Sequence, residues 1–216
     1  MLKNVIFDLD GTLLDTSQGI IESVQYTADK LKMKQLTEKE LRSFIGPPLK
    51  KSFIDICNCT KTEAQKAVIV FRSYYQNGAV FHARPYDGIE ELCRRLCEQG
   101  IRIGVATNKP QRFAVPLIQK FGLDKYIDPV CGADEEGKHG KADLIRQCIS
   151  NMGGTVSETV LVGDTENDAN GAQEAGVGFI AVTYGFGFKK GEKIVNNHFI
   201  GSVDDPIEIF DMLRKR

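Results

Sequence analysis

The chain shows no excess of charge of either sign, since its 216 residues include 28 lysines and arginines against 29 aspartates and glutamates, for a net charge of −1. This balance gives no electrostatic reason to expect binding to nucleic acid or to a membrane surface. Long apolar runs are also missing, and none approaches the roughly 20 residues that a membrane-spanning helix needs. The N-terminal residues lead directly into a predicted strand, so we expect no signal peptide and a cytoplasmic location.

A disulfide framework is missing as well. The six cysteines are scattered along the chain and lack the spacing typical of a small secreted protein. Cys93 and Cys97 lie four residues apart on a predicted helix, where two thiols can share a metal, and Cys57 and Cys59 form a second close pair. Reduced packing residues are the favoured interpretation of both pairs. The length of the chain fits one medium domain, or one domain with a small insert.

What the chain does contain is an alternation of strands and helices. Predicted strands cover residues 5–7, 101–107, 126–133, 159–162 and 179–183, and helical patterns separate the last four. Such alternation is typical of a parallel α/β sheet. We therefore predict a Rossmann-like, doubly wound parallel sheet, followed by a last helix over residues 205–216.

Residues 16–83 interrupt this alternation, because their apolar spacing is helical throughout. Thr37-Glu38-Lys39-Glu40 and Thr60-Lys61-Thr62-Glu63 have the capping-box form that begins a helix, and Gly46-Pro47-Pro48 breaks the run between them. We predict an α/β core domain of residues 1–15 and 84–216 and an inserted all-helical domain of residues 16–83. The alternative is that these helices simply cover the sheet.

Two aspartates directly follow the first predicted strand, in the string Asp8-Leu9-Asp10-Gly11-Thr12. Parallel sheets bind ligands just beyond the carboxyl ends of their strands, so both carboxylates are expected at the mouth of a site. Asp and Gly also favour turns, and a plain strand-ending turn is the ordinary alternative. A chance appearance of the whole five-residue string in a chain of this length is on the order of 10⁻³.

Two later strand ends and one helix start also carry polar groups. Because the carboxyl ends of parallel strands share one edge of the sheet, these groups are expected to lie near Asp8 and Asp10. The ordinary alternatives are a helix cap for Thr107 with Asn108, a turn followed by a surface acid for Asp164 with Asp168, and a solvated lysine for Lys141. The groups are, in order, Thr107 with Asn108, Asp164 with Asp168, and Lys141.

With its first motif the chain resembles the haloacid dehalogenase-like (HAD) superfamily, in which an apolar strand is followed by D-x-D-G-T. Most members hydrolyse phosphate esters through an aspartyl-phosphate. The resemblance implies that Asp8 is the nucleophile and Asp10 the acid/base. The helical insert lies where members with a C1-type cap carry it.

The same resemblance extends to three further motifs. It matches Thr107 to the second-motif Thr/Ser and Lys141 to the third-motif basic residue, although Ala142 stands where members often carry proline. It also implies that Asp164 is a direct Mg²⁺ ligand and that Asp168 acts through a bound water.

Phosphoryl transfer requires a nucleophile, neutralisation of the phosphate charge and a proton for the leaving oxygen. We expect Asp8 and Asp164, with the carbonyl of Asp10, to hold Mg²⁺, which prefers oxygen ligands. A free aspartate ionises near pH 4, so Asp8 is expected to be anionic without a base. Thr12 is expected to orient Asp10, and the phosphate is expected to be bound by Thr107, Asn108 and Lys141.

The predicted function is Mg²⁺-dependent hydrolysis of a small phosphorylated metabolite. The Gly-Pro-Pro loop (residues 46–48) and the Tyr-Gly-Phe-Gly segment (residues 184–187) resemble those of the phosphoglycolate phosphatase-like and 5′-nucleotidase-like branch. We expect substrate contacts from Gly46, Lys50 and Lys109, with three aromatic residues that either face the substrate or fill the core: Phe44, Phe53 and Tyr184. The alternatives are a β-phosphoglucomutase-like phosphomutase, a dehalogenase that attacks carbon, and a non-enzymatic binding protein. The sequence leaves open whether the protein is a monomer or a homodimer.

Overall fold

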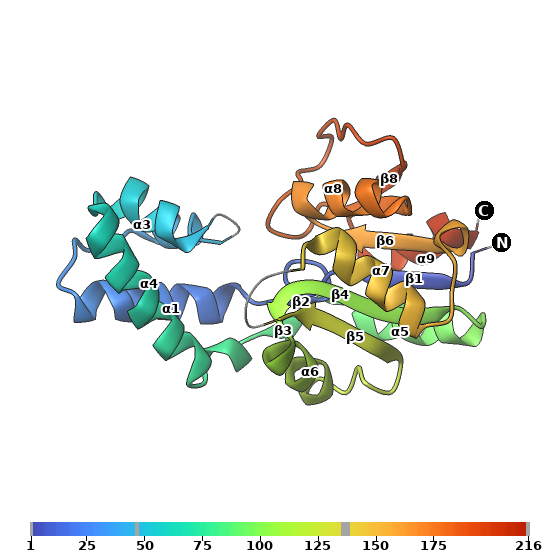
Figure 1. Ribbon diagram of the computed structural model, residues 1–216, viewed down its shortest axis with the longest axis horizontal. Coiled ribbons are helices and arrows are strands. Elements are labelled where there is room, and N and C mark those ends of the chain that lie inside the picture. The colour runs from blue at the N-terminus through green and yellow to red at the C-terminus, as the bar shows by residue number, and fades with distance from the viewer. Residues whose placement is uncertain (1, 46–47, 135–138, 215–216) are drawn as a thin grey trace. The chain divides into compact units, whose positions relative to one another are not determined.

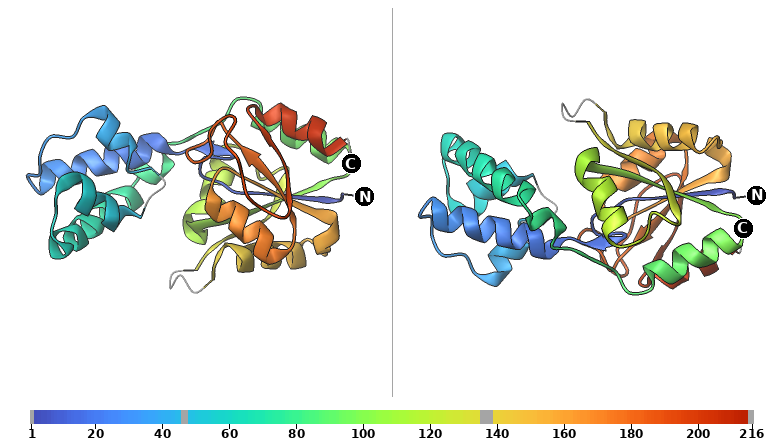
Figure 2. Two further views of the ribbon diagram at one scale, coloured as in Figure 1. Left: turned by 90° about the horizontal axis from the view of Figure 1, so that it is seen from above. Right: turned by 90° about the horizontal axis from the view of Figure 1, so that it is seen from below.

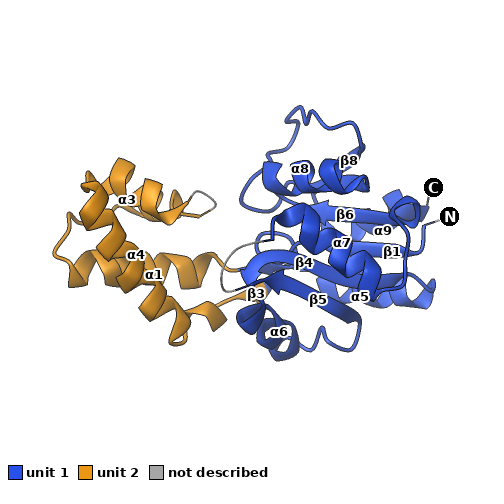
Figure 3. Ribbon diagram, in the orientation of Figure 1, with its two compact units in different colours: residues 1–15, 85–216 blue, residues 16–84 orange. Residues whose placement is uncertain are grey.

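The computed structural model describes residues 2–45, 48–134 and 139–214, and the statements below refer to these ranges. Contacts divide the chain into two compact units (Figure 3). We call residues 1–15 with 85–216 the α/β unit and residues 16–84 the helical unit.

Six described strands form a parallel sheet in the α/β unit, in the order β5-β4-β1-β6-β7-β8 (Figure 1). This arrangement confirms the predicted α/β fold with its parallel sheet. The pattern of the sequence does not predict β8, which lies at one edge of the sheet. The strands are β1 (Asn4–Phe7), β4 (Arg102–Pro110), β5 (Ile127–Ala133), β6 (Thr159–Gly163), β7 (Gly178–Val182) and β8 (Phe199–Val203).

Strand β1 lies in the middle of the sheet, paired with β4 on one side and β6 on the other. Its four residues are buried, which explains why Asn4 is followed by an unbroken apolar run, Val5–Phe7. In register, Phe7 at its end lies beside Val105 and Val162. Whatever follows β1 therefore emerges at the centre of the carboxyl edge of the sheet.

Helices cover both faces of the sheet (Figure 2). Helices α7 and α8 pack together on one face, where their apolar residues meet those of β1, β6 and β7. Helices α5 and α9 pack together on the other face. The helices are α5 (Ile89–Glu98), α6 (Gln111–Lys120), α7 (Lys141–Asn151), α8 (Glu166–Ala175) and α9 (Pro206–Arg214), with a 3₁₀ turn, η2 (Val156–Glu158), before β6.

The helical unit has its own apolar core. Both predicted capping boxes are confirmed, because the Thr37 and Thr60 hydroxyls accept from the amides of Glu40 and Glu63 at 3.3 and 3.2 Å. The elements are α1 (Ser17–Lys30), α2 (Glu38–Arg42), α3 (Leu49–Cys57), α4 (Lys61–Gln76) and the 3₁₀ turn η1 (Ala79–Phe81).

Phe44 and Phe53 belong to that core. Their rings meet edge to face with centroids 4.9 Å apart, and both side chains are buried. Of the two interpretations of these aromatic residues, the core role is therefore the correct one, and they do not present a face to a ligand.

Two very short strands pair with each other, β2 (Leu14–Asp15) and β3 (Arg84–Pro85). They carry the two connections at which the chain passes from one unit to the other.

None of the helices in the described ranges is long and apolar enough to cross a bilayer. The six cysteines are free, and Cys93 is buried in the α/β unit.

Candidate active site

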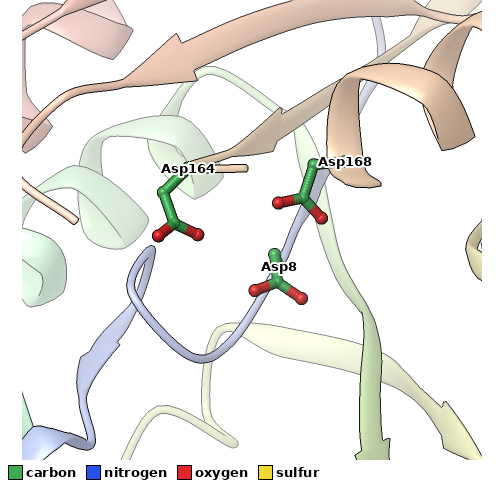
Figure 4. Close-up of side chains that lie close together, drawn as sticks. All are labelled: Asp8, Asp164 and Asp168. Atoms are coloured by element: carbon green, nitrogen blue, oxygen red, sulfur yellow. The ribbon is translucent and has the colours of Figure 1, made fainter. Parts of the chain in front are cut away.

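Asp8 and Asp164 come directly after two neighbouring strands, β1 and β6. The ladder between them continues one residue further, since the Asp8 amide donates to the Val162 carbonyl at 2.9 Å. Figure 4 shows that the side chains of Asp8, Asp164 and Asp168 lie close together. Each offers an oxygen, and these oxygens all lie within 4.8 Å of one another. The structure thus brings together residues that lie as much as 160 positions apart in the sequence.

Lys141 begins α7 and reaches into this group of carboxylates. Its Nζ lies 2.5 Å from Asp8 Oδ1 and 2.6 Å from Asp168 Oδ1, and its side chain is 3% exposed. The aliphatic stem passes over Gly171 of α8, where an added Cβ would lie only 2.6 Å from Lys141 Cγ. The glycine is therefore needed for the lysine to follow this path.

Asp168 is fixed by the first turn of its own helix. It forms a capping box with Thr165, whose amide and hydroxyl donate to Asp168 Oδ2 at 3.0 and 2.6 Å. The other carboxylate oxygen is then directed at Lys141. One side chain thus caps α8 and holds the ammonium group beside Asp8.

Asp164 is held from two other segments of the α/β unit. Its Oδ2 accepts from the amides of Phe186 and Gly187 at 2.8 and 3.3 Å, and its Oδ1 accepts from the Thr12 hydroxyl at 3.3 Å. The expectation that Thr12 orients Asp10 is therefore wrong, because the hydroxyl points to Asp164 instead. The two amides were not predicted as part of the site. The signal for them was the Tyr-Gly-Phe-Gly segment, in which glycine allows a close approach of the backbone.

The site carries more negative than positive charge. Burial, opposed by Lys141 and reinforced by Asp168 and Asp164, raises the pKa of Asp8 from 3.8 to about 7. Burial and Asp168 raise the pKa of Asp164 to about 6, although the two amides oppose the shift. Burial disfavours the charge on Lys141, but Asp168 and Asp8 outweigh it and raise the lysine pKa. In the protein alone, the pKa of Asp8 therefore lies above that of a free aspartate.

This donor set fits a hard divalent cation. Three buried carboxyl groups face a single ammonium group, so a cation of charge two would compensate the excess and favour the ionised form of Asp8 and Asp164. All the donors are oxygens, as Mg²⁺ prefers. The Asp10 carboxylate lies outside this group of three.

Thr107 and Asn108 lie near the end of β4 and differ in environment. Thr107 is buried, and its hydroxyl accepts from the Lys109 amide at 3.2 Å, which leaves its own proton to donate. Asn108 is exposed. Both were predicted to bind phosphate, and both remain candidates for that role.

The three residues predicted to contact the substrate fall in different places. Lys109 is buried, and its ammonium group contacts both oxygens of Asp10 at 2.8 Å. Lys50 is an exposed residue in the first turn of α3, in the helical unit. Gly46 lies outside the described residues.

The fold and the site define an α/β protein with a carboxylate-rich centre at the carboxyl edge of its sheet. Residues 5–182 match the family model of the haloacid dehalogenase-like hydrolases. The chain therefore belongs to the haloacid dehalogenase-like hydrolase family, and the predicted family is confirmed.

Individual relatives agree with this assignment. A 5′-nucleotidase of Pseudomonas aeruginosa is 35% identical over 185 residues, which cover 85% of this chain and 84% of the relative. A phosphoglycolate phosphatase of Agrobacterium fabrum is 33% identical over 187 residues, with 84% and 80% covered. The crystal structure of a predicted phosphatase from Clostridium acetobutylicum superimposes with a TM-score of 0.83 at 34% identity and covers 100% of both chains.

Proposed function

We propose that the protein is a Mg²⁺-dependent phosphatase that hydrolyses a small phosphorylated metabolite through an aspartyl-phosphate. The observation that carries the proposal is the position of Asp8. Its carboxyl group stands at the end of the central strand, 2.5 Å from a buried ammonium group and close to two further carboxyl groups. A carboxylate in such a place can act as a nucleophile toward phosphorus.

In this proposal the cation is held by Asp8, Asp164 and the carbonyl of Asp10. When bound, it supplies positive charge that offsets the repulsion between the Asp8 carboxylate and the phosphate dianion. Asp168 contributes by fixing Lys141. Lys141, Thr107 and Asn108 bind the phosphate oxygens, and Lys141 adds the second positive charge at that point.

The chemistry then takes two steps. An Asp8 oxygen attacks phosphorus, the bond to the ester oxygen breaks, and Asp10 gives that oxygen a proton. Water then attacks the phosphorus of the aspartyl-phosphate while Asp10 accepts its proton, and Asp8 and inorganic phosphate are released.

The relatives support the choice of substrate class. One is a 5′-nucleotidase and another a phosphoglycolate phosphatase, so we propose a nucleoside monophosphate or phosphoglycolate as the substrate. We also propose that the helical unit serves as the cap, in which Gly46 and Lys50 help to select the leaving group.

The test is a panel of small phosphorylated metabolites assayed for released phosphate with Mg²⁺, with EDTA, and with Mg²⁺ restored. We expect turnover that EDTA stops and Mg²⁺ restores, and no turnover in Asp8→Asn. The matched control is Asp211→Asn, which alters an exposed aspartate of the α/β unit and should leave the rate unchanged. Turnover close to that of the wild type in Asp8→Asn, or hydrolysis that ignores EDTA, would reject the mechanism. A product that keeps its phosphate would indicate a phosphomutase instead.

A further inference from the structure

Lys109 makes an unusual pair of contacts at the end of β4. Its side chain is 5% exposed, and its Nζ lies 2.8 Å from each oxygen of Asp10, which is 30% exposed. Removing an ammonium group from water is costly unless it is paired, so a buried lysine keeps such a partner persistently. The contact joins residues 99 positions apart in the sequence.

The backbone of β4 explains how Lys109 comes to point this way. Thr107 pairs with Gly132 of β5, and the next paired residue is Pro110 with Ala133, so the register shifts across residues 108 and 109. Bulges of this kind redirect side chains next to active sites. Here Asn108 is exposed and Lys109 is buried, and the Lys109 amide donates to the Thr107 hydroxyl. One residue thus links Thr107 to Asp10.

Within the described parts of the chain, the contacts to the Asp10 carboxylate come from Lys109. It lies in the loop after β1, next to Gly11 with φ +84°, and the backbone of the loop is closed by the Gly11 amide on the Leu14 carbonyl at 2.8 Å. The terminal torsion of an aspartate is broad and roughly two-fold, so its oxygens take no single direction without a partner. A lysine bound to both oxygens restricts that freedom.

We propose that Lys109 is a positioning residue, which holds the Asp10 carboxylate as the base that accepts the proton of water when the Asp8-phosphate is hydrolysed. This inference rests on the proposed function. Lys109 was expected to contact the substrate, and in this proposal it contacts Asp10 instead. Contacts to both oxygens fix the orientation of the carboxylate that accepts this proton. The first step, attack of Asp8 on a substrate whose leaving group needs no proton, should not depend on Lys109.

The two steps are separated with p-nitrophenyl phosphate, because p-nitrophenolate leaves without help from an acid. In Lys109→Met we expect kcat to fall about tenfold or more while kcat/KM stays within about threefold, so that KM falls with kcat. Rapid mixing should show a burst of about one p-nitrophenolate per active site. Asp10→Asn should give the same pattern with a larger loss, on the order of 10²–10⁴ in kcat.

Lys109→Arg and Lys125→Met complete the design. Arginine keeps a charge and can donate to both carboxylate oxygens, so it should recover part of kcat even if the methionine variant folds poorly. Lys125→Met removes an exposed ion pair with Glu90, with Nζ 2.6 Å from Oε1, and should leave all constants unchanged.

Three results would overturn the proposal: an equal loss of kcat and kcat/KM, a rise in KM at unchanged kcat as for a phosphate ligand, or no burst. A failure of the proposed function is distinguishable, because wild-type protein would then release no p-nitrophenolate, or would release it at the same rate as Asp8→Asn.

Discussion

At the scale of single residues, Asp164 shows how much support one carboxylate receives. It is fully buried, and it accepts from a hydroxyl in the loop after β1 and from two amides in the segment after β7. These donors fix both of its oxygens and reduce the cost of keeping it ionised. The segment can approach because it lacks a side chain at Gly185, where an added Cβ would lie 2.2 Å from the Gly11 carbonyl oxygen.

Gly185→Ala should therefore damage the cation site. The new methyl group would also lie 2.6 Å from Asp164 Cβ, so either the aspartate or the segment must move. We expect the Mg²⁺ concentration for half-maximal activity to rise about tenfold or more, as for other residues that orient metal ligands. Magnesium titrations of activity and of melting temperature measure this. Gly201→Ala is the control, because its Cβ meets only the mobile end of Met212; an unchanged titration in Gly185→Ala would contradict the argument.

The sequence predicts which residues stand at strand ends but not what holds them. Asp8 and Asp164 could be placed because a short apolar run that stops at an acid marks the end of a buried strand. The contacts of Thr12 and Lys109 could not, since their partners lie 152 and 99 positions away. The direction of Lys109 also depends on a register shift in β4 that leaves no mark in the composition of the strand.

At the scale of elements, helix caps serve two purposes in this protein. The box at Thr60 begins α4 on an exposed surface, with the Thr60 amide donating to Glu63 Oε2 at 2.8 Å. The box at Thr165 begins α8 in the same way, but its acidic member, Asp168, also contacts Lys141. The two caps are alike in local geometry, but only the acidic residue of the Thr165 box contacts a residue of the proposed active site.

Thr165→Ala and Thr60→Ala should therefore separate stability from activity. Each removes the threonine hydroxyl of a capping box and should lower the free energy of unfolding by about 1 kcal/mol. Only Thr165→Ala releases a bond to Asp168 and with it the support of Lys141, so only this variant should lose kcat, by about tenfold. Urea unfolding and steady-state rates measure the two effects. Equal kcat values in the two variants would show that the cap does not support the site.

The elements that the sequence predicts best are those with long, periodic patterns. The T-x-x-E strings locate two helix starts, whereas the box at Thr165 has aspartate in the last position and was not recognised as a cap. The edge strand β8 was missed because it is only partly buried, with Gly201 in its centre. Strands β2 and β3 are two residues long, which is below the length at which alternation can be seen.

At the scale of the whole molecule, the α/β unit contains the described residues that carry the proposed chemistry. Its charge arrangement has a consequence for stability. The folded protein binds protons at Asp8 and Asp164 more tightly than an unfolded chain does, because their pKa values are raised from 3.8 to about 7 and about 6. As the pH rises through this window, these two groups therefore destabilise the folded state, and the destabilisation is complete above about pH 7.

A bound divalent cation should remove that destabilisation, and protons should compete with it. We expect Mg²⁺ to raise the melting temperature more at about pH 8 than at about pH 5.5, because at the lower pH protons already neutralise part of the site. At a Mg²⁺ concentration 100 times the dissociation constant, binding adds about 2.7 kcal/mol to the free energy of unfolding. For a chain of this size that corresponds to several degrees, at about 2–4 °C per kcal/mol.

Calorimetry with Mg²⁺ and with EDTA at both pH values measures the difference. Asp164→Asn is the reference, since it removes one titrating ligand and should reduce both the pH effect and the gain from Mg²⁺. If Mg²⁺ raised the melting temperature of the wild-type protein equally at the two pH values, the cation would not bind at the carboxylates whose pKa values are raised.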